Sequence, residues 1–209
     1  MGTDMKKLKL AVLLMALLLL CSACGPRFVS DESGQGYVDS KTDIFYVAMP
    51  ATFEAASREA EPIGQFKDDQ FDRELSFYAI PSLDAELFVV DEYGFVYCAA
   101  DPMPTFEDLS VNEVIVCEED AVSVELFRIT GVNSIAELVR TWKIAEDAEL
   151  PMVKATQMRR LKMATTTHPN LYYCINFYAY EGGEAYLHDS ESDRTVVCPA
   201  EIASLICSK

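Results

Sequence analysis

Residues 171–189 read LYYCINFYAYEGGEAYLHD, and this stretch decides the fold. Successive side chains of a β-strand point to opposite faces of its sheet, and the odd positions from Leu171 to Ala179 are the more apolar set. A three-residue loop at 181–183 pairs Phe177 with Leu187 and keeps apolar side chains together, whereas a two-residue loop mixes the faces. We therefore predict an antiparallel hairpin with one buried face.

The opposite face of this hairpin collects tyrosine and polar side chains, and we call it the tyrosine face. Tyrosine rings combine flat apolar area with a polar tip, which suits sugars and protein partners alike. The alternative is that the rest of the chain covers this face and leaves only the hydroxyl groups at its edge. The candidate binding residues are Tyr172, Asn176, Tyr178, Tyr180, Tyr186 and His188.

The remaining chain alternates further strands with two helices. Ile135, Leu138 and Trp142 recur at helical spacing and predict an amphipathic helix near 135–147, opened by a capping box of Ser134 and Glu137. A C-terminal helix follows Pro199. Runs rich in β-branched and aromatic residues predict strands at 42–48, 75–80, 87–90, 95–99, 113–117, 122–129, 158–164 and 195–198.

These elements predict an α+β fold of antiparallel β-hairpins and a sheet with two helices. The domain spans residues 37–209, and sub-units at 37–130 and 131–209 are one way to divide it. The stretch 24–36 contains Gly, Ser and charged residues and predicts a flexible tether.

The N-terminus has the pattern of an export signal. Lys6, Lys7 and Lys9 precede an apolar run at 10–20. That run is too short to span a bilayer, which takes about 20 residues, so it favours a secretory signal over a permanent span.

Residues 21–25 read CSACG and resemble the lipobox of bacterial lipoproteins. Small Ala23 and Ser22 precede Cys24, while Cys21 stands where leucine is commoner. The resemblance implies removal of residues 1–23 as a signal peptide, attachment of lipid (diacylglyceryl and palmitate) at Cys24, and a cell-membrane protein on the extracytoplasmic side. The alternative is an ordinary cleaved signal with two incidental cysteines.

Charge excludes one class of partner. The chain has 17 Lys+Arg against 34 Asp+Glu, a formal net charge of −17, and removal of residues 1–23 makes it −19. A surface this acidic repels phosphates, so we expect no nucleic-acid partner. The stretches YVDSKTDIFYVAMPATFE (37–54) and HPNLYYCINFYAYEGGEAYLHD (168–189) resemble uncharacterised lipoproteins of anaerobic gut bacteria.

Five cysteines remain in the body of the protein, each in an apolar stretch and none with zinc-site spacing. We predict that all five are reduced and buried, as small hydrophobic residues: Cys98, Cys117, Cys174, Cys198 and Cys207. Such thiols would suit an anaerobic habitat.

Catalytic and metal signals are weak. We find no nucleophile elbow, P-loop, zinc-protease or dinucleotide motif. His168 fits a surface loop, and the Asp189-x-Glu191-x-Asp193 pattern lacks the later glycine and glutamate of a calcium loop. We expect no catalytic residue, metal or cofactor. The sequence favours a lipid-anchored, non-catalytic binding module for a glycan, cell-wall component or protein; the alternative is a small carboxylate-dependent hydrolase of envelope or glycan substrates.

Overall fold

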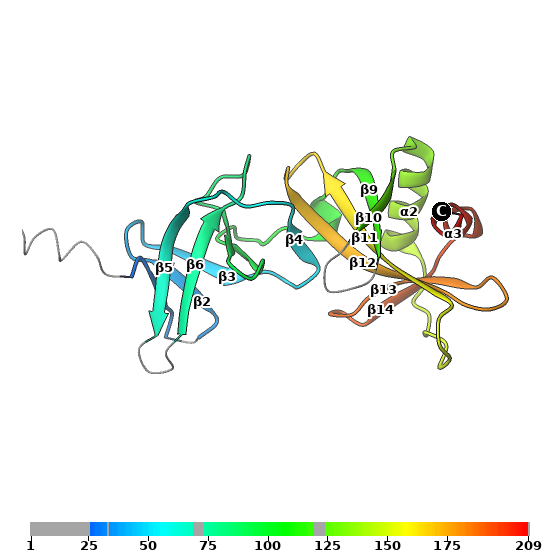
Figure 1. Cartoon of the computed structure of the whole chain (residues 1–209), viewed down its shortest axis with the longest axis horizontal. Helices are drawn as coiled ribbons and strands as arrows, with labels where there is room; N and C mark the ends of the chain where they lie inside the picture. Colours follow the sequence, from blue (N-terminus) through cyan, green and yellow to red (C-terminus); the bar gives the residue numbers. More distant parts are fainter. Residues whose placement is uncertain (1–25, 33, 69–72, 119–123, 209) are drawn as a thin grey trace, which may run out of the picture.

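The structure is a computed structural model that describes residues 26–32, 34–68, 73–118 and 124–208. Two β-rich bodies lie side by side, with the barrel towards the N-terminus and the sheet with its helices towards the C-terminus (Figure 1). The predicted signal peptide and Cys24 lie outside the described residues.

The N-terminal body is a closed barrel with the strand order β1-β2-β3-β8-β7-β6-β5. A parallel contact between β1 and β5, at Phe28 and Phe66, closes it. Its interior is a core of mainly aromatic side chains, in which Phe28 and Phe77 have ring centroids 4.3 Å apart. The strands are β1 (Phe28–Ser30), β2 (Gly36–Asp39), β3 (Ile44–Ala48), β5 (Pro62–Asp68), β6 (Arg73–Ala79), β7 (Phe88–Asp91) and β8 (Val96–Cys98).

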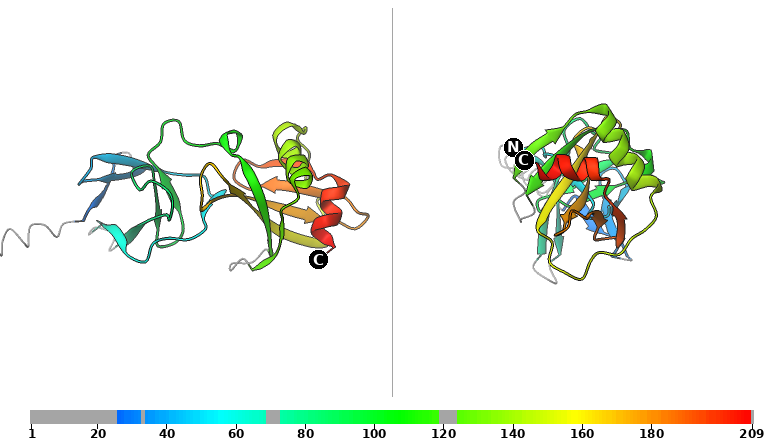
Figure 2. Two further views of the ribbon diagram at one scale, coloured as in Figure 1. Left: turned by 90° about the horizontal axis from the view of Figure 1, so that it is seen from above. Right: turned by 90° about the vertical axis from the view of Figure 1, so that its right-hand side faces the viewer.

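The C-terminal body is an antiparallel sheet with the order β10-β9-β11-β12-β13-β14. Helices α2 and α3 pack together on one face (Figure 2). A short strand from the barrel side, β4 (Phe53–Ala55), pairs with the start of β12 and so joins the two bodies. The elements are β9 (Val111–Glu118), β10 (Glu125–Ile129), α2 (Val132–Ile144), β11 (Gln157–Thr165), β12 (Leu171–Ala179), β13 (Ala185–Asp189), β14 (Arg194–Val197) and α3 (Ala200–Cys207), with a 3-10 turn η1 (Phe106–Asp108) before β9.

The predicted register of the β12–β13 hairpin is confirmed. Phe177 pairs with Leu187 and Ala179 with Ala185, while Tyr178 lies opposite Tyr186. The odd positions of β12 are all buried and face the helices. Hydrophobic alternation specified this register because a shift of one residue would expose the whole apolar set.

The predicted α+β fold class is wrong, because the described chain is mostly β. The two predicted helices do exist as α2 and α3, but α2 begins at Val132 with Gly131 as its N-cap, so Ser134 and Glu137 do not form the predicted capping box. The sequence underestimated the strands because β1, β2, β4 and β5 are short or contain Gly and Pro. Residues 119–123, part of one predicted hairpin, lie outside the described residues.

The predicted tether and sub-unit boundary also need correction. Residues 28–30 form β1, and the Phe28 side chain is fully buried in the barrel core, so the flexible stretch cannot extend to residue 36. The two sheets divide the chain between β8 and β9, because β9 and β10 belong to the C-terminal sheet rather than to a unit ending at 130. Within the described residues no helix is long and apolar enough to cross a membrane.

Candidate functional site

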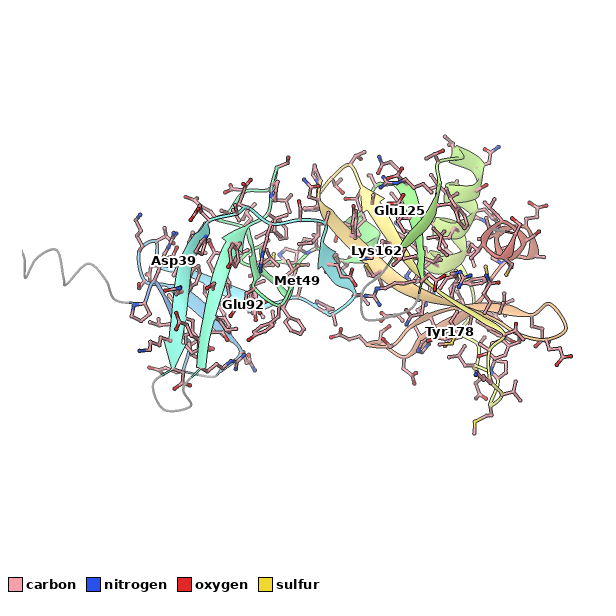
Figure 3. The ribbon with its side chains drawn as sticks, in the orientation of Figure 1. Asp39, Met49, Glu92, Glu125, Lys162 and Tyr178 are labelled. Atoms are coloured by element: carbon pink, nitrogen blue, oxygen red, sulfur yellow. The ribbon has the colours of Figure 1, made fainter. Side chains whose placement is uncertain are left out.

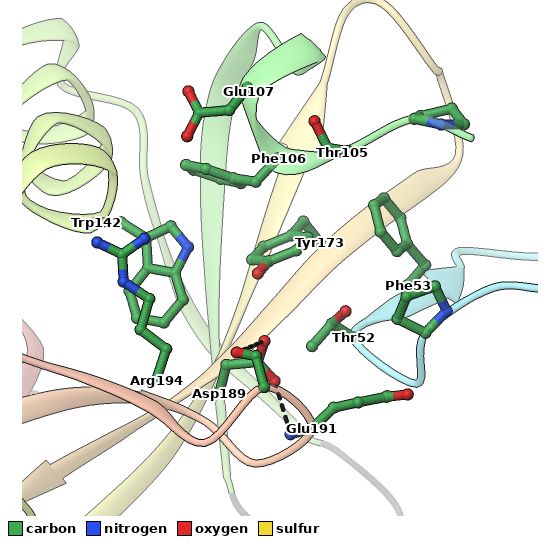
Figure 4. Close-up of a pocket in the computed structure, with 13 residues that line it drawn as sticks. Thr52, Phe53, Thr105, Phe106, Glu107, Trp142, Tyr173, Asp189, Glu191 and Arg194 are labelled. Carbon is green, nitrogen blue, oxygen red and sulfur yellow. Dashed lines mark hydrogen bonds between the residues drawn. The ribbon is translucent and has the colours of Figure 1, made fainter. Parts of the chain in front are cut away.

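A pocket of about 420 Å³ opens where the two bodies meet, and we call it the waist pocket (Figure 4). Five regions far apart in the sequence form it: β4 with the segment before it, the segment around η1, α2, β12, and the β13–β14 turn. Its lining residues are Pro50, Thr52, Phe53, Pro104, Thr105, Phe106, Glu107, Trp142, Tyr173, Asp189, Glu191, Ser192 and Arg194.

Aromatic side chains form the walls of the waist pocket. The ring of Tyr173 lies 4.7 Å from that of Phe106 and 5.4 Å from that of Phe53, centroid to centroid. Trp142, the only tryptophan, is 2% exposed and packs on the same tyrosine at 6.5 Å. Trp142 belongs to the core, as its place on the apolar side of the predicted helix indicates, and its ring also lines the pocket.

A turn held by Asp189 forms the polar side of the pocket. The buried Asp189 carboxylate accepts a hydrogen bond from the Glu191 backbone N–H at 2.9 Å and one from the Ser192 hydroxyl at 2.7 Å. Burial, and then the nearby Asp189 charge, raise the pKa of Tyr173 to about 12. The Tyr173 hydroxyl therefore stays protonated at neutral pH and can donate a hydrogen bond.

Two further contacts fix the rim. Glu191 accepts a hydrogen bond from the Ala51 backbone N–H, which ties the β13–β14 turn to the segment that precedes β4. Arg194 lies over the Trp142 ring, 5.2 Å from its centroid, and its Nε is 3.3 Å from the Asp147 carboxylate. The guanidinium is therefore held in place by other parts of the protein.

The charges around the pocket favour a neutral or cationic ligand. Glu107, Asp189 and Glu191 contribute three carboxylates against the one guanidinium of Arg194. Lys143 is paired with Glu107 and Asp147 with Arg194, so the excess of negative charge remains and an anionic ligand would meet repulsion. The hydroxyl groups of Thr52, Thr105 and Ser192 add neutral donors and acceptors.

Two of the three pocket carboxylates, those of Asp189 and Glu191, have structural roles. A glycosidase needs one carboxyl group free to donate a proton and another free to attack or to activate water. Asp189 instead holds its own turn and Glu191 binds the Ala51 backbone. Among the described residues there is also no group of three or more His, Cys, Asp and Glu that could hold a metal ion.

The tyrosine face lies on the side of the sheet away from the helices (Figure 3). Asn176, Tyr180 and His188 are buried there, while Tyr172, Tyr178 and Tyr186 are partly exposed. The Tyr178 ring contacts His188 at 5.9 Å, and Tyr180 meets Tyr186 edge-on at 5.7 Å. The predicted residues thus do come together, but as a half-covered surface rather than an open platform.

We predict a modest stability cost for truncating the tyrosine face. Because Tyr178 is partly exposed, Tyr178→Ala should lower the free energy of unfolding by about 1–2 kcal/mol, between a cross-strand pair and a full core truncation. Urea denaturation of the variant measures this cost. A loss of about 4 kcal/mol would mean that the face is covered and would remove it as a binding surface.

The body cysteines are all free, and four are buried: Cys98, Cys117, Cys174 and Cys198. The prediction of burial is wrong for Cys207, which lies exposed at the end of α3 because the short helix turns this position away from the sheet. Burial raises the thiol pKa of Cys174, and that of Cys198 to about 12, which suppresses the reactive thiolate.

Thiol labelling should separate these two classes. In a protein lacking residues 1–24, one thiol should react quickly in the native state, namely Cys207, and all five after denaturation without reductant. Ellman titration counts them, and Cys207→Ser is the control that should abolish the fast phase. A total below five in denaturant would reveal disulfides and contradict the reduced state.

No protein family, curated protein or solved structure matches the chain.

The waist pocket was not predicted from the sequence. Its residues come from segments around positions 50, 105, 142, 173 and 190, and no local motif links them. Asp189 and Glu191 were noted only as part of an incomplete calcium pattern, and in the structure they form a tight turn.

Proposed function

We propose that this protein is a membrane-anchored, extracytoplasmic lipoprotein that acts as a non-catalytic binding module at the cell envelope, with the waist pocket as its ligand-binding site. The observation that carries the proposal is the pocket itself. Its volume of about 420 Å³ lies within the usual range for small-ligand sites. Its walls combine the C-terminal sheet and α2 with β4 and the segments that precede β4 and β9.

The chemistry of the walls points to a neutral or cationic ligand rich in hydroxyl or amine groups, such as a short glycan of the envelope. Aromatic rings contact the apolar faces of sugars, while carboxylates and hydroxyls bind sugar hydroxyl groups. The lining supplies both sets of groups and an excess of negative charge.

The lipobox supports the location, and the fold brings the body close to the lipid. With lipid on Cys24 and the barrel beginning at Arg27 and Phe28, only residues 25 and 26 lie between them. Three residue steps span at most about 10 Å. The barrel would therefore sit at the membrane surface and the waist pocket farther out, since the sheet lies beyond the barrel (Figure 1).

Trp142 provides a direct test, because the only tryptophan lines the pocket. Titration of the acylated protein in detergent with soluble glycan fragments of the envelope should change the tryptophan emission in a saturable way. Phe106→Leu keeps an apolar side chain but removes a flat ring from the wall, so it should weaken binding about tenfold, equivalent to about 1.4 kcal/mol.

Phe45→Leu is the matched control, because Phe45 is 42% exposed on the barrel and does not line the pocket. It should bind like the parent. No saturable signal with any fragment, or equal binding by Phe106→Leu and the parent, would contradict the proposal that the waist pocket is the ligand-binding site. Release of new reducing ends during the titration would favour the hydrolase alternative.

A further inference from the structure

A second, smaller cavity lies on the tyrosine face, on the opposite side of the sheet from the helices. Its volume is about 110 Å³, several times what one water molecule needs. Side chains from β11, β12 and β13 line it together with the segment before β4, and its lining residues are Ala51, Thr52, Arg160, Cys174, Asn176, His188, Asp189, Ser190 and Glu191.

Three polar side chains form a row across the sheet at this cavity. Asn176 of β12 pairs with Arg160 of β11 on one side and with His188 of β13 on the other. Directly paired residues on one face have Cβ atoms about 5 Å apart. The functional groups of the row can therefore meet one small molecule together.

Two atoms of this row are buried without a hydrogen-bond partner among the described residues. The Asn176 side chain is 92% buried, because its exposed fraction is 8%, and its Oδ1 acceptor is unsatisfied. The Nε donor of Arg160 is unsatisfied as well. A buried polar atom without a partner costs free energy, so this pair of atoms points to a ligand.

The neighbouring groups are already engaged. The Nη2 of Arg160 binds Glu54, and Lys162 Nζ binds the same carboxylate at 2.7 Å. His188 Nδ1 lies 2.9 Å from the Thr195 hydroxyl, which orients the ring. With Asp189 and Glu191 at the rim, the cavity has no excess of positive charge that would hold an anion.

From this geometry we infer that the cavity binds a secondary amide, in which the ligand N–H donates to Asn176 Oδ1 and its carbonyl accepts from Arg160 Nε. The N–H and the carbonyl of a trans secondary amide point in opposite directions, so an amide lying between β12 and β11 can donate to an acceptor on one strand and accept from a donor on the other, the two kinds of atom that are unsatisfied here. Two sources share this chemistry, the acetamido group of an amino sugar and the peptide bond.

Ligand-observed saturation-transfer NMR on the acylated protein in detergent tests the inference with matched probes. N-acetylglucosamine and glucose share the pyranose ring, and only the former has an amide, so it should bind more tightly than glucose, which can use the waist pocket alone. N-acetylalanine methylamide represents the peptide source, and the tighter of the two amides identifies which source the cavity prefers. Equal binding of glucose, or no binding of either amide because the cavity takes ordered water only, would overturn the inference.

Variants assign the signal to the cavity. Asn176→Leu keeps the approximate side-chain size and removes the acceptor, so it should weaken amide binding at least tenfold. Asn133→Leu makes the same change at an exposed position of α2 and should have no effect. The comparison of probes on the parent protein holds even if Asn176→Leu fails to fold.

The two sites are distinguishable by the same variants. Phe106→Leu should leave amide binding at the cavity unchanged, and Asn176→Leu should leave the Trp142 titration of the waist pocket unchanged. Amide binding that is lost in Phe106→Leu but kept in Asn176→Leu would place the amide in the waist pocket and overturn the second site, without affecting the proposed function.

Discussion

Cys24→Ala should leave the precursor uncut and unlipidated, which is an all-or-none effect on anchoring. In bacterial lipoproteins the lipid is attached to the lipobox cysteine thiol, which is Cys24 in the proposed assignment, and the signal peptidase cuts only after the lipid is attached. Two or more acyl chains hold a protein stably on a bilayer, whereas a single chain binds only reversibly. Intact-mass measurement of the membrane fraction should show a mature acylated parent and, for the variant, a precursor that keeps residues 1–23.

Cys21→Ala is the matched control, because Cys21 lies three positions before the cleavage site and bulky Leu20 precedes it. This variant should be processed and acylated like the parent. If Cys24→Ala yields the same mature mass and membrane retention as the parent, the chain is not a lipoprotein. In that case the proposed membrane location fails, while the waist pocket keeps its own test.

Secondary structure and strand register were predicted correctly from the sequence where one hydrophobic periodicity extended over many residues. The alternation in β12 and β13 gave the pairing of Phe177 with Leu187 correctly, because burial of one face makes every other register costly. The helical spacing of Ile135 and Leu138 located α2 to within three residues. In both cases the local pattern and the long-range packing point to the same structure.

The barrel could not be predicted in this way, because its strands are short and pair over long distances. Phe28 looks like an isolated aromatic residue in a Gly- and Ser-rich stretch, and only its contact with Phe66 of β5 shows that it belongs to the core. Gly64 in β5 reads as a turn signal, yet its Cα lies so close to Phe28 and Arg27 that a side chain there would clash. The waist pocket combines side chains from segments far apart in the sequence, so no local pattern indicated it either.

Asp39→Ala should destabilise the protein more than any surface substitution. The Asp39 carboxylate is fully buried and accepts hydrogen bonds from Arg27 Nε at 2.9 Å and Nη2 at 2.5 Å, while Arg27 Nη1 donates to the Ile63 carbonyl at 2.6 Å. Removing one partner of a buried ion pair leaves the other without compensation. We expect a loss of about 3 kcal/mol in the free energy of unfolding, the low end of the usual range, because Arg27 keeps some contact with water.

The Arg27–Asp39 pair should also make the free energy of unfolding depend on pH in the acid range. Burial alone raises the pKa of Asp39, but hydrogen bonds from Arg27, the Lys41 backbone N–H and Thr42, together with the charge of Arg27, outweigh it and lower the pKa from 3.8 to about 2. A carboxyl group whose pKa is lower in the folded than in the unfolded protein stabilises the fold at pH values above its unfolded-state pKa. This stabilisation disappears as the pH falls through its folded-state pKa. As the pH falls from about 4 to 2, the free energy of unfolding of the parent should therefore decrease by about 2 kcal/mol through Asp39. Asp39→Ala lacks this contribution and should not show that decrease.

Urea denaturation of both proteins at pH 7, 4 and 2 measures the two effects. The control is Glu32→Ala, which removes an exposed carboxylate from the turn between β1 and β2. The difference in the free energy of unfolding between the parent and Asp39→Ala should become smaller as the pH falls. The free energy of unfolding of Glu32→Ala should equal that of the parent at each pH. A difference in the free energy of unfolding that stays constant from pH 7 to pH 2 would mean that Asp39 contributes by packing alone.

Because Arg27 holds β1 in the barrel, loss of the pair should also release β1 and lengthen the link to Cys24. Faster proteolysis between Cys24 and Gly36 in Asp39→Ala than in the parent would report that release.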